Sequence, residues 1–339
     1  MTELAGPWSL AALVGARVAG SDPLGTSYHR DALAEELPTL IDEVAPLVAE
    51  ETRLIGPGSP DAQVIDRGEW VKRNLGFMAH LVGKAEDAHG VQSAGAEAVA
   101  AMESATLLGV LGRRVLGQYE LVVPTGEQAD SVFLVADNVL HMERNHQFIP
   151  REFRTWIVLH ECTHRAQFEG VSWMRDYFLS LVDGLVGASG MDAQAFERML
   201  RRLAESLRGE RPLIDERGLF GTIASDEQRA LIDKVQALMS LLEGHGHVVM
   251  DRIGERILPT QDRMSAILKQ RRNDPRMALF LRITGLEMKF RQYEDGERFV
   301  LGVEEIAGWD ALDAVWSGPD AVPTLEEVAD PQRWLDRVA

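Results

Sequence analysis

The sequence contains an HExxH motif within the stretch Trp156-Ile157-Val158-Leu159-His160-Glu161-Cys162-Thr163-His164. The apolar pattern from Arg151 to Phe168 predicts a helix around it. With about 100° between successive residues, His160 and His164 lie about 40° apart around the helix axis, so their imidazole rings can converge on one ion. Glu161 lies about 60° from His164 and can reach a water molecule on that ion. The stretch therefore predicts a metal-binding helix that carries its own general base.

Zinc is the metal that this combination of residues favours. Catalytic zinc takes nitrogen, sulfur or carboxylate ligands in near-tetrahedral geometry and keeps one position for water. The ion lowers the pKa of that water toward about 7, and Glu161 is expected to accept its proton. The alternative interpretation is a pair of helix-face histidines that hydrogen-bond to neighbouring groups. Cys162 lies about 160° from His164, so we expect a small buried apolar group and not a nucleophile.

The residues that follow the motif exclude one subclass of zinc peptidases. The metzincin pattern requires Gly three residues after the second histidine and His six residues after it. These positions hold Gln167 and Gly170. Glu169 lies about 140° from His164 around the helix, so it is not expected to be a ligand unless the helix ends before it. The third ligand is therefore expected in another helix.

The predicted helix from Asp226 to Leu258 offers that ligand. Glu243 lies at the centre of its apolar face, which is made by Ile232, Met239, Met250 and Ile257. A lone carboxylate is unfavourable there unless it is paired or bound to a metal. We therefore predict Glu243 as the third ligand. His247, about 40° away on the same face, is the alternative ligand, and otherwise a hydrogen-bond donor to the transition state. His245 lies about 160° from Glu243 and is expected to face solvent.

Other candidates lie near Glu243 and in a later helix. Gly244 and Gly246 are unusual inside a helix, and a close approach of another backbone or of a ligand would explain them. Asp251 is expected either to orient a ligand histidine or to be a solvated acid. Tyr293 is expected either to pack in the core or to donate a hydrogen bond to a developing oxyanion.

Helical periodicity dominates the rest of the chain, and the fold class is predicted as mainly α. Helices are expected at about residues 9–19, 33–48, 62–85, 94–116, 173–186, 192–207 and 277–293, the last ending at Asp295-Gly296, with short helices between the last prolines. Tyr119–Val123 and Val132–Ala136 are predicted as strands joined by a turn at Pro124–Gly126. The second strand is expected to be an edge that pairs with an extended substrate.

The overall prediction is one compact domain over 1–339. It is a zincin-like helical body with one small β-hairpin or short sheet beside the metal-binding helix. A division into a helical part, 1–115, and a zincin-like catalytic part, 116–339, is the alternative.

Composition limits the partners. The 339 residues carry a net charge of −18, which argues against nonspecific nucleic-acid binding and against docking on anionic lipid. One cysteine allows no intrachain disulfide. Apolar stretches are shorter than the roughly 20 residues of a membrane helix, and the N-terminus lacks a basic region before its apolar run. We therefore expect a cytoplasmic protein without nucleic-acid or membrane partners, and the sequence leaves its oligomeric state open.

A family resemblance adds to this interpretation. The string HECTHRAQF, from His160 to Phe168, followed by Trp173–Tyr177, resembles a bacterial zincin-like family of proposed hydrolases, described as zinc-dependent metalloproteases. The similarity extends to Val115–Tyr119, Glu243–His245, Gly285–Tyr293, Val315-Trp316 and Pro331–Trp334. It implies a helical zincin-like fold and a zinc site. Part of this family carries a label that links it to biosynthesis of the deazaflavin redox coenzyme.

Together, these observations predict a zinc-dependent hydrolase, specifically a metallopeptidase that acts on a peptide or protein substrate. His160, His164 and Glu243 are the predicted zinc ligands, and Glu161 is the predicted base. The alternative belongs to another class: a zincin-like protein without catalysis, whose metal is structural and which binds a partner or ligand.

Overall fold

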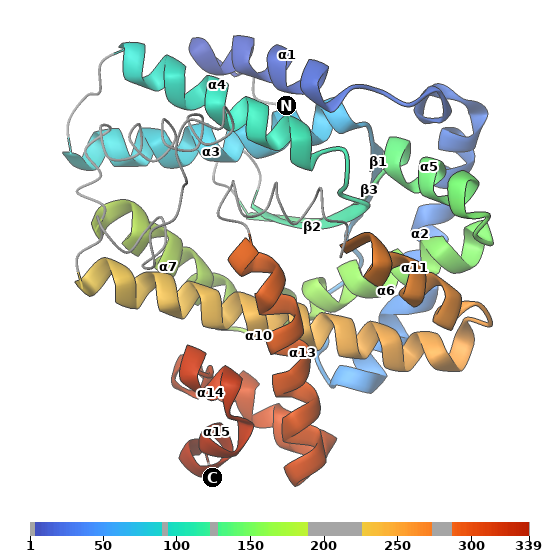
Figure 1. Ribbon diagram of the computed structural model, residues 1–339, viewed down its shortest axis with the longest axis vertical. Helices are drawn as coiled ribbons and strands as arrows, with labels where there is room; N and C mark the ends of the chain where they lie inside the picture. Colours follow the sequence, from blue (N-terminus) through green and yellow to red (C-terminus); the bar gives the residue numbers. More distant parts are fainter. Residues whose placement is uncertain (1–3, 90–93, 123–127, 189–225, 273–286, 339) are drawn as a thin grey trace. The chain divides into compact units, whose positions relative to one another are not determined.

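The computed structural model describes residues 4–89, 94–122, 128–188, 226–272 and 287–338 (Figure 1). Most of these residues are helical, and one small sheet accompanies them, which confirms the predicted fold class. The helix expected at 192–207 and the turn expected at Pro124–Gly126 lie outside the described residues.

Two compact units divide the described chain. The first holds residues 4–49 and 57–165, and the second holds 50–56, 166–188 and the described residues from 226 onward. The single domain and its alternative division at residue 115 stay predictions.

The first unit contains the strands and the N-terminal helices. Its elements are α1 (Pro7–Ala19), the 3-10 helix η1 (Pro23–Thr26), most of α2 (Tyr28–Thr52), β1 (Asp61–Ile65), α3 (Arg67–His89), α4 (Ala94–Leu111), β2 (Gly117–Val122), β3 (Gln128–Val135), α5 (Ala136–His146) and most of α6 (Pro150–Glu169). Helices α1, α3 and α4 lie side by side (Figure 1). Their shared core includes Trp8, Ala11, Trp70, Val71, Ala105 and, from the sheet, Phe133 and Val135.

The sheet has the strand order β1-β3-β2, so β3 is its central strand. It pairs in parallel with β1 and antiparallel with β2. The prediction that Val132–Ala136 forms the substrate-binding edge is therefore wrong. The continuous apolar run from Val132 to Ala136 is fully buried, as expected where a strand is covered on both faces. Within the described sheet, β1 and β2 are the edges.

Strand β1 is missing from the sequence-based prediction, which begins a helix at Ala62. The chain from Asp61 to Ile65 instead pairs with Ser131–Val135, and α3 begins only at Arg67. A strand of five residues is too short to show a clear alternation of apolar and polar side chains. The strand is stabilised by pairing with a segment far away in the sequence, and the residues of β1 alone do not indicate that pairing.

The second unit is helical in its described residues. Its elements are α7 (Met174–Ala188), α10 (Asp226–Ile257), α11 (Gln261–Arg272), α13 (Glu287–Ala307), the 3-10 helices η2 (Trp309–Ser317) and η3 (Pro319–Ala321), α14 (Leu325–Ala329) and α15 (Pro331–Val338). None of the helices in the described part of the chain combines the length and the apolar character that a membrane crossing requires.

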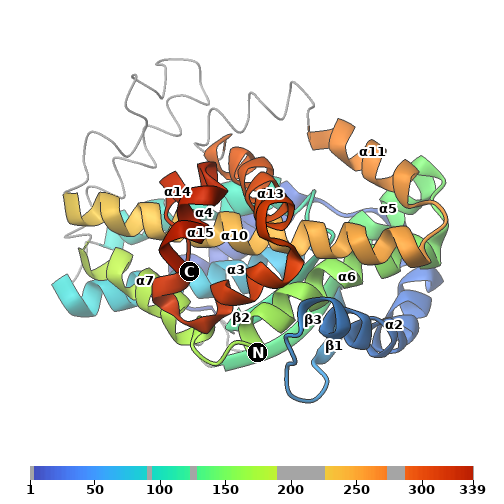
Figure 2. The same ribbon diagram turned by 90° about the horizontal axis from the view of Figure 1, so that it is seen from below.

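Helices α10 and α13 cross, as Figure 2 shows from below, and two glycines let them approach closely. A Cβ atom built on Gly244 overlaps the backbone of Gly296, and one built on Gly296 overlaps the carbonyl group of Ser240. The prediction that another backbone approaches Gly244 is therefore confirmed. The prediction that a helix ends at Asp295-Gly296 is wrong, because this glycine is a packing position inside α13 and not a helix terminus.

Candidate metal centre

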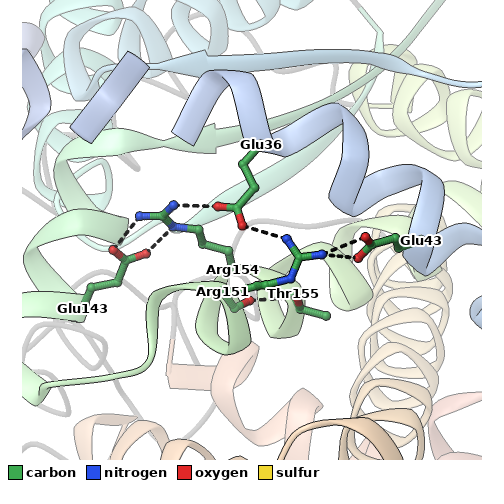
Figure 3. Close-up of polar contacts among 6 residues, drawn as sticks. All are labelled: Glu36, Glu43, Glu143, Arg151, Arg154 and Thr155. Atoms are coloured by element: carbon green, nitrogen blue, oxygen red, sulfur yellow. Dashed lines mark hydrogen bonds and ion pairs between the residues drawn. The ribbon is translucent and has the colours of Figure 1, made fainter. Parts of the chain in front are cut away.

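Ion pairs fix the N-terminal part of α6, the helix that carries the HExxH motif (Figure 3). Arg154 donates two hydrogen bonds to Glu143 of α5, at 2.7 and 2.9 Å, and one to Glu36 of α2, at 2.6 Å. Arg151 donates to Glu36 and to Glu43, also on α2. Burial alone lowers the pKa of Arg154, but its hydrogen bonds to the two carboxylates outweigh burial and leave the pKa raised. Arg154 therefore stays charged, and charge-assisted hydrogen bonds hold α6 against its neighbours.

The two histidines of the motif converge, as their helical spacing predicts. The Nε2 atoms of His160 and His164 lie 3.1 Å apart. Their ring centroids are 4.4 Å apart, and the ring planes meet at 76°. Both residues are half-buried, so the pair is partly protected from water. Their role as metal ligands stays a prediction at this point.

The separation of the two nitrogens fits a zinc ion. Zinc lies about 2.0–2.1 Å from an imidazole nitrogen, so two such nitrogens in tetrahedral geometry lie roughly 3.3 Å apart. The observed Nε2–Nε2 distance of 3.1 Å is close to this value. A hydrogen bond between two neutral rings is the other explanation of the same distance. His160 and His164 are therefore able to supply two of the protein ligands that a zinc ion needs.

Glu161 is held by the edge strand β2. The backbone N–H of Tyr119 donates a hydrogen bond to its Oε2 atom, at 2.9 Å. The residue is almost completely buried. Gly117, two residues earlier in β2, makes room for the side chain, because a Cβ atom at Gly117 would lie 3.0 Å from Cγ of Glu161. The strand therefore fixes the orientation of the carboxylate, which is what a general base requires.

Cys162 is a buried apolar group, as the sequence predicts. The residue is 4% exposed. Burial raises the pKa of its thiol to about 12. A thiol with such a pKa stays protonated at physiological pH and is a poor nucleophile. This agrees with a packing role behind the histidines and not with cysteine catalysis.

Helix α10 of the second unit carries the other candidates. Glu243 is half-buried, and its neighbours along the helix from Ala237 to Met250 are mostly buried. His247 is buried as well, at 7% exposure. The prediction that His245 faces solvent is wrong, since it is only 2% exposed. Helix α10 packs against α7, α13 and α14, so its central part does not keep the solvent face that an amphipathic surface helix has.

Gln167 has surroundings that were not predicted from the sequence. Its side-chain amide is fully buried and donates a hydrogen bond to the backbone carbonyl of Leu242, at 2.9 Å. The same nitrogen lies 3.0 Å from Nδ1 of His245. A signal was present in the sequence, because residues 160, 164 and 167 follow the i, i+4, i+7 pattern of one helix face. A polar residue on the stripe of the two histidines is a candidate for supporting them.

The remaining candidates are placed as follows. Glu169 forms an ion pair with Arg175, which agrees with the prediction that it is not a ligand. The Oδ1 atom of Asp251 accepts a hydrogen bond from Gln261 of α11, at 2.7 Å, and its suggested role beside a ligand histidine stays a prediction. Tyr293 lies in α13, three residues before Gly296, but its side chain lies outside the description.

Comparisons with known proteins identify the family of the chain. The chain matches the model of a family described as zincin-like metallopeptidase over residues 7–335. None of the curated proteins matches it significantly. Among solved structures, a protein from Chloroflexus aurantiacus, described as a proposed hydrolase with a novel fold, is similar over 97% of each chain, with 27% sequence identity and a TM-score of 0.70. The family description implies a metal-dependent hydrolase. Because the match spans nearly the whole sequence and includes the HExxH helix, the chain belongs to the zincin-like metallopeptidase family.

Proposed function

We propose that this protein is a zinc-dependent hydrolase, specifically a metallopeptidase, with Glu161 as its general base. The observation that carries the proposal is the arrangement on α6. Two imidazole nitrogens lie 3.1 Å apart, and the carboxylate of Glu161, in the same motif, is oriented by a strand amide. Membership of the zincin-like metallopeptidase family supports the same chemistry.

The proposed zinc ligands are His160, His164 and Glu243, each of which offers one ligand atom. Two histidines and one glutamate form a known donor set of catalytic zinc, which leaves a fourth position for water. Glu243 is preferred over His247 because a carboxylate among the buried residues of α10 loses hydration, and binding to a cation offsets that loss. His247 is the alternative ligand.

The residues of the chain have separate roles in the proposed hydrolysis. When bound, the zinc ion lowers the pKa of a coordinated water molecule and polarises the substrate carbonyl. Glu161 accepts the proton of the attacking water and passes it to the leaving amine. The N–H of Tyr119 keeps the Glu161 carboxylate in position during this exchange. His247 and Tyr293 are the proposed donors to the negative charge that develops on the carbonyl oxygen.

An extended peptide is the proposed substrate. An edge strand can bind such a peptide by backbone pairing, with pockets for alternate side chains. Strand β2 is the edge that reaches Glu161, through the Tyr119 amide. Strand β2 is therefore the proposed substrate-binding edge, instead of Val132–Ala136. The net charge of −18 disfavours nucleic acids and anionic membranes as partners.

A peptide-library cleavage assay tests the proposal. We expect the zinc-loaded protein to cleave a subset of peptides, a chelator to abolish cleavage, and added zinc to restore it, because the attacking water depends on the ion. Cleavage that persists after complete removal of metal would contradict a zinc mechanism. Zinc binding without cleavage of any peptide would favour the alternative, a structural metal site in a protein that binds a partner.

A further inference from the structure

The buried side chain of Gln167 contacts α10 both before and after the proposed ligand Glu243. Gln167, fully buried, contacts the carbonyl oxygen of Leu242, one residue before Glu243, and Nδ1 of His245, two residues after it. All these contacts lie within the second unit. Gln167 also belongs to α6, where it follows His164 by three residues. Within the second unit, Gln167 therefore connects the C-terminal end of α6 to the backbone around Glu243.

The hydrogen-bonding capacity of the groups fixes their roles. A backbone carbonyl only accepts, so the atom of Gln167 beside Leu242 must be the amide nitrogen. That nitrogen has a second hydrogen, which it donates to Nδ1 of His245 at 3.0 Å. The ring of His245 consequently accepts at Nδ1, and the proton of its neutral form lies on Nε2. Both amide hydrogens of Gln167 are thus directed to α10.

Aromatic side chains hold the ring of His245 in this orientation. The ring stacks on Trp309 with centroids 5.9 Å apart and planes 11° apart. Trp316 meets it edge-on, with centroids 5.0 Å apart. The indole N–H of Trp309 donates to the carbonyl oxygen of Glu51, and the carbonyl oxygen of Trp316 accepts from Trp173. Because hydrogen bonds hold Trp309 and Trp316 in place, the ring of His245 has little freedom to turn away from Gln167.

We propose that Gln167 and His245 are positioning residues that hold the carboxylate of Glu243 for the zinc ion. The inference rests on the proposed function, because it assumes that Glu243 is a ligand. Two hydrogen bonds on either side of a residue resist rotation and sliding of that part of α10. Groups that orient a ligand in this way raise metal affinity without touching the ion.

Two substitutions test the inference through zinc affinity, measured by competition with a chromophoric chelator. Gln167→Met keeps the length of the side chain and removes both donors. His245→Phe keeps an aromatic ring against Trp309 and Trp316 and removes the acceptor, and it carries the test if the first variant does not fold. We expect each to weaken zinc binding about tenfold or more. The double variant is expected to lose less than the product of the two single losses, because the partners share one bond.

A matched control separates positioning from a general loss of stability. Trp334→Phe removes another buried donor to a backbone carbonyl, that of Ala321, at 2.8 Å. It is expected to lower Tm by a few degrees, as Gln167→Met does, but to leave zinc affinity unchanged. The absorption spectrum of the Co2+-loaded protein adds a readout of ligand geometry. It should change in Gln167→Met and His245→Phe and not in the control.

The outcomes distinguish this inference from the proposed function. If Gln167→Met and His245→Phe bind zinc within about twofold of the wild type while Glu243→Gln loses at least about tenfold, the positioning role is overturned and the function stands. If the wild type binds no zinc, the proposed function is overturned, and the inference with it. Weaker binding in both variants with an unchanged control supports the inference.

Discussion

Replacing Glu161 by glutamine is expected to lower peptide hydrolysis by a factor of roughly 10²–10⁴ while the protein keeps its zinc. Glutamine has nearly the same shape and can still accept the hydrogen bond that the Tyr119 N–H donates. It cannot accept a proton from water at neutral pH. The proposed ligands on α6 and α10 are unchanged by this substitution. The measurement is kcat on a peptide identified in the library assay, together with the zinc content of the same preparation.

Glu327 of α14 provides the control for this substitution. It is also a buried carboxylate, and it forms an ion pair with Arg337 at 2.6 Å. Glu327→Gln makes the same chemical change at a residue outside the proposed base, the proposed ligands and the proposed substrate strand. We expect it to lower stability and to leave kcat of the folded protein near the wild-type value. Full activity in Glu161→Gln would remove this residue from the mechanism.

Replacing Gly296 by alanine is expected to destabilise the second unit by about 3 kcal/mol or more. The new methyl group would overlap the carbonyl group of Ser240 and press on Gly244. Both neighbours are backbone of α10, so no side chain can move aside, and the two helices must separate. Because Gly244 follows Glu243 directly, zinc affinity should fall as well. Urea unfolding of the metal-free protein, followed by circular dichroism, measures the loss in free energy of unfolding.

A second glycine inside a helix supplies the comparison. A Cβ atom at Gly83 of α3 meets nothing within 4 Å. Gly83→Ala is therefore expected to leave stability unchanged or to raise it by up to about 1 kcal/mol, because alanine favours the helix. If Gly296→Ala were as stable as the wild type, the close crossing of α10 and α13 would be incorrect.

Local sequence patterns predict the elements that bury one apolar stripe. The stripe from Leu33 to Val48 is buried in α2, and the HExxH helix and α10 appear with nearly the expected bounds. Residues three and four positions apart lie side by side on a helix. The apolar pattern that predicts a helix is therefore found within the helical segment itself. The convergence of His160 and His164 follows from the same spacing.

The features that could not be predicted from the sequence depend on partners far away along the chain. Strand β1 exists through pairing with β3. His245 lies on the side of α10 that the helical wheel assigns to solvent, but residues of η2 cover it. Gly296 has the sequence context of a helix end and is instead the contact with Gly244. In each case the deciding neighbour is separated by tens of residues, and a periodicity within one segment carries no information about it.

The zinc content of the purified protein, measured by elemental analysis, shows whether His160, His164 and Glu243 bind the metal. The wild type and His247→Gln should contain close to one zinc ion per chain, whereas His160→Ala and Glu243→Gln should contain little. This pattern would establish the two histidines and Glu243 as the ligands. Zinc retained by Glu243→Gln but lost from His247→Gln would assign the third ligand to His247 instead. A wild type that contains no zinc and takes up none on titration would contradict a zinc site formed by these residues.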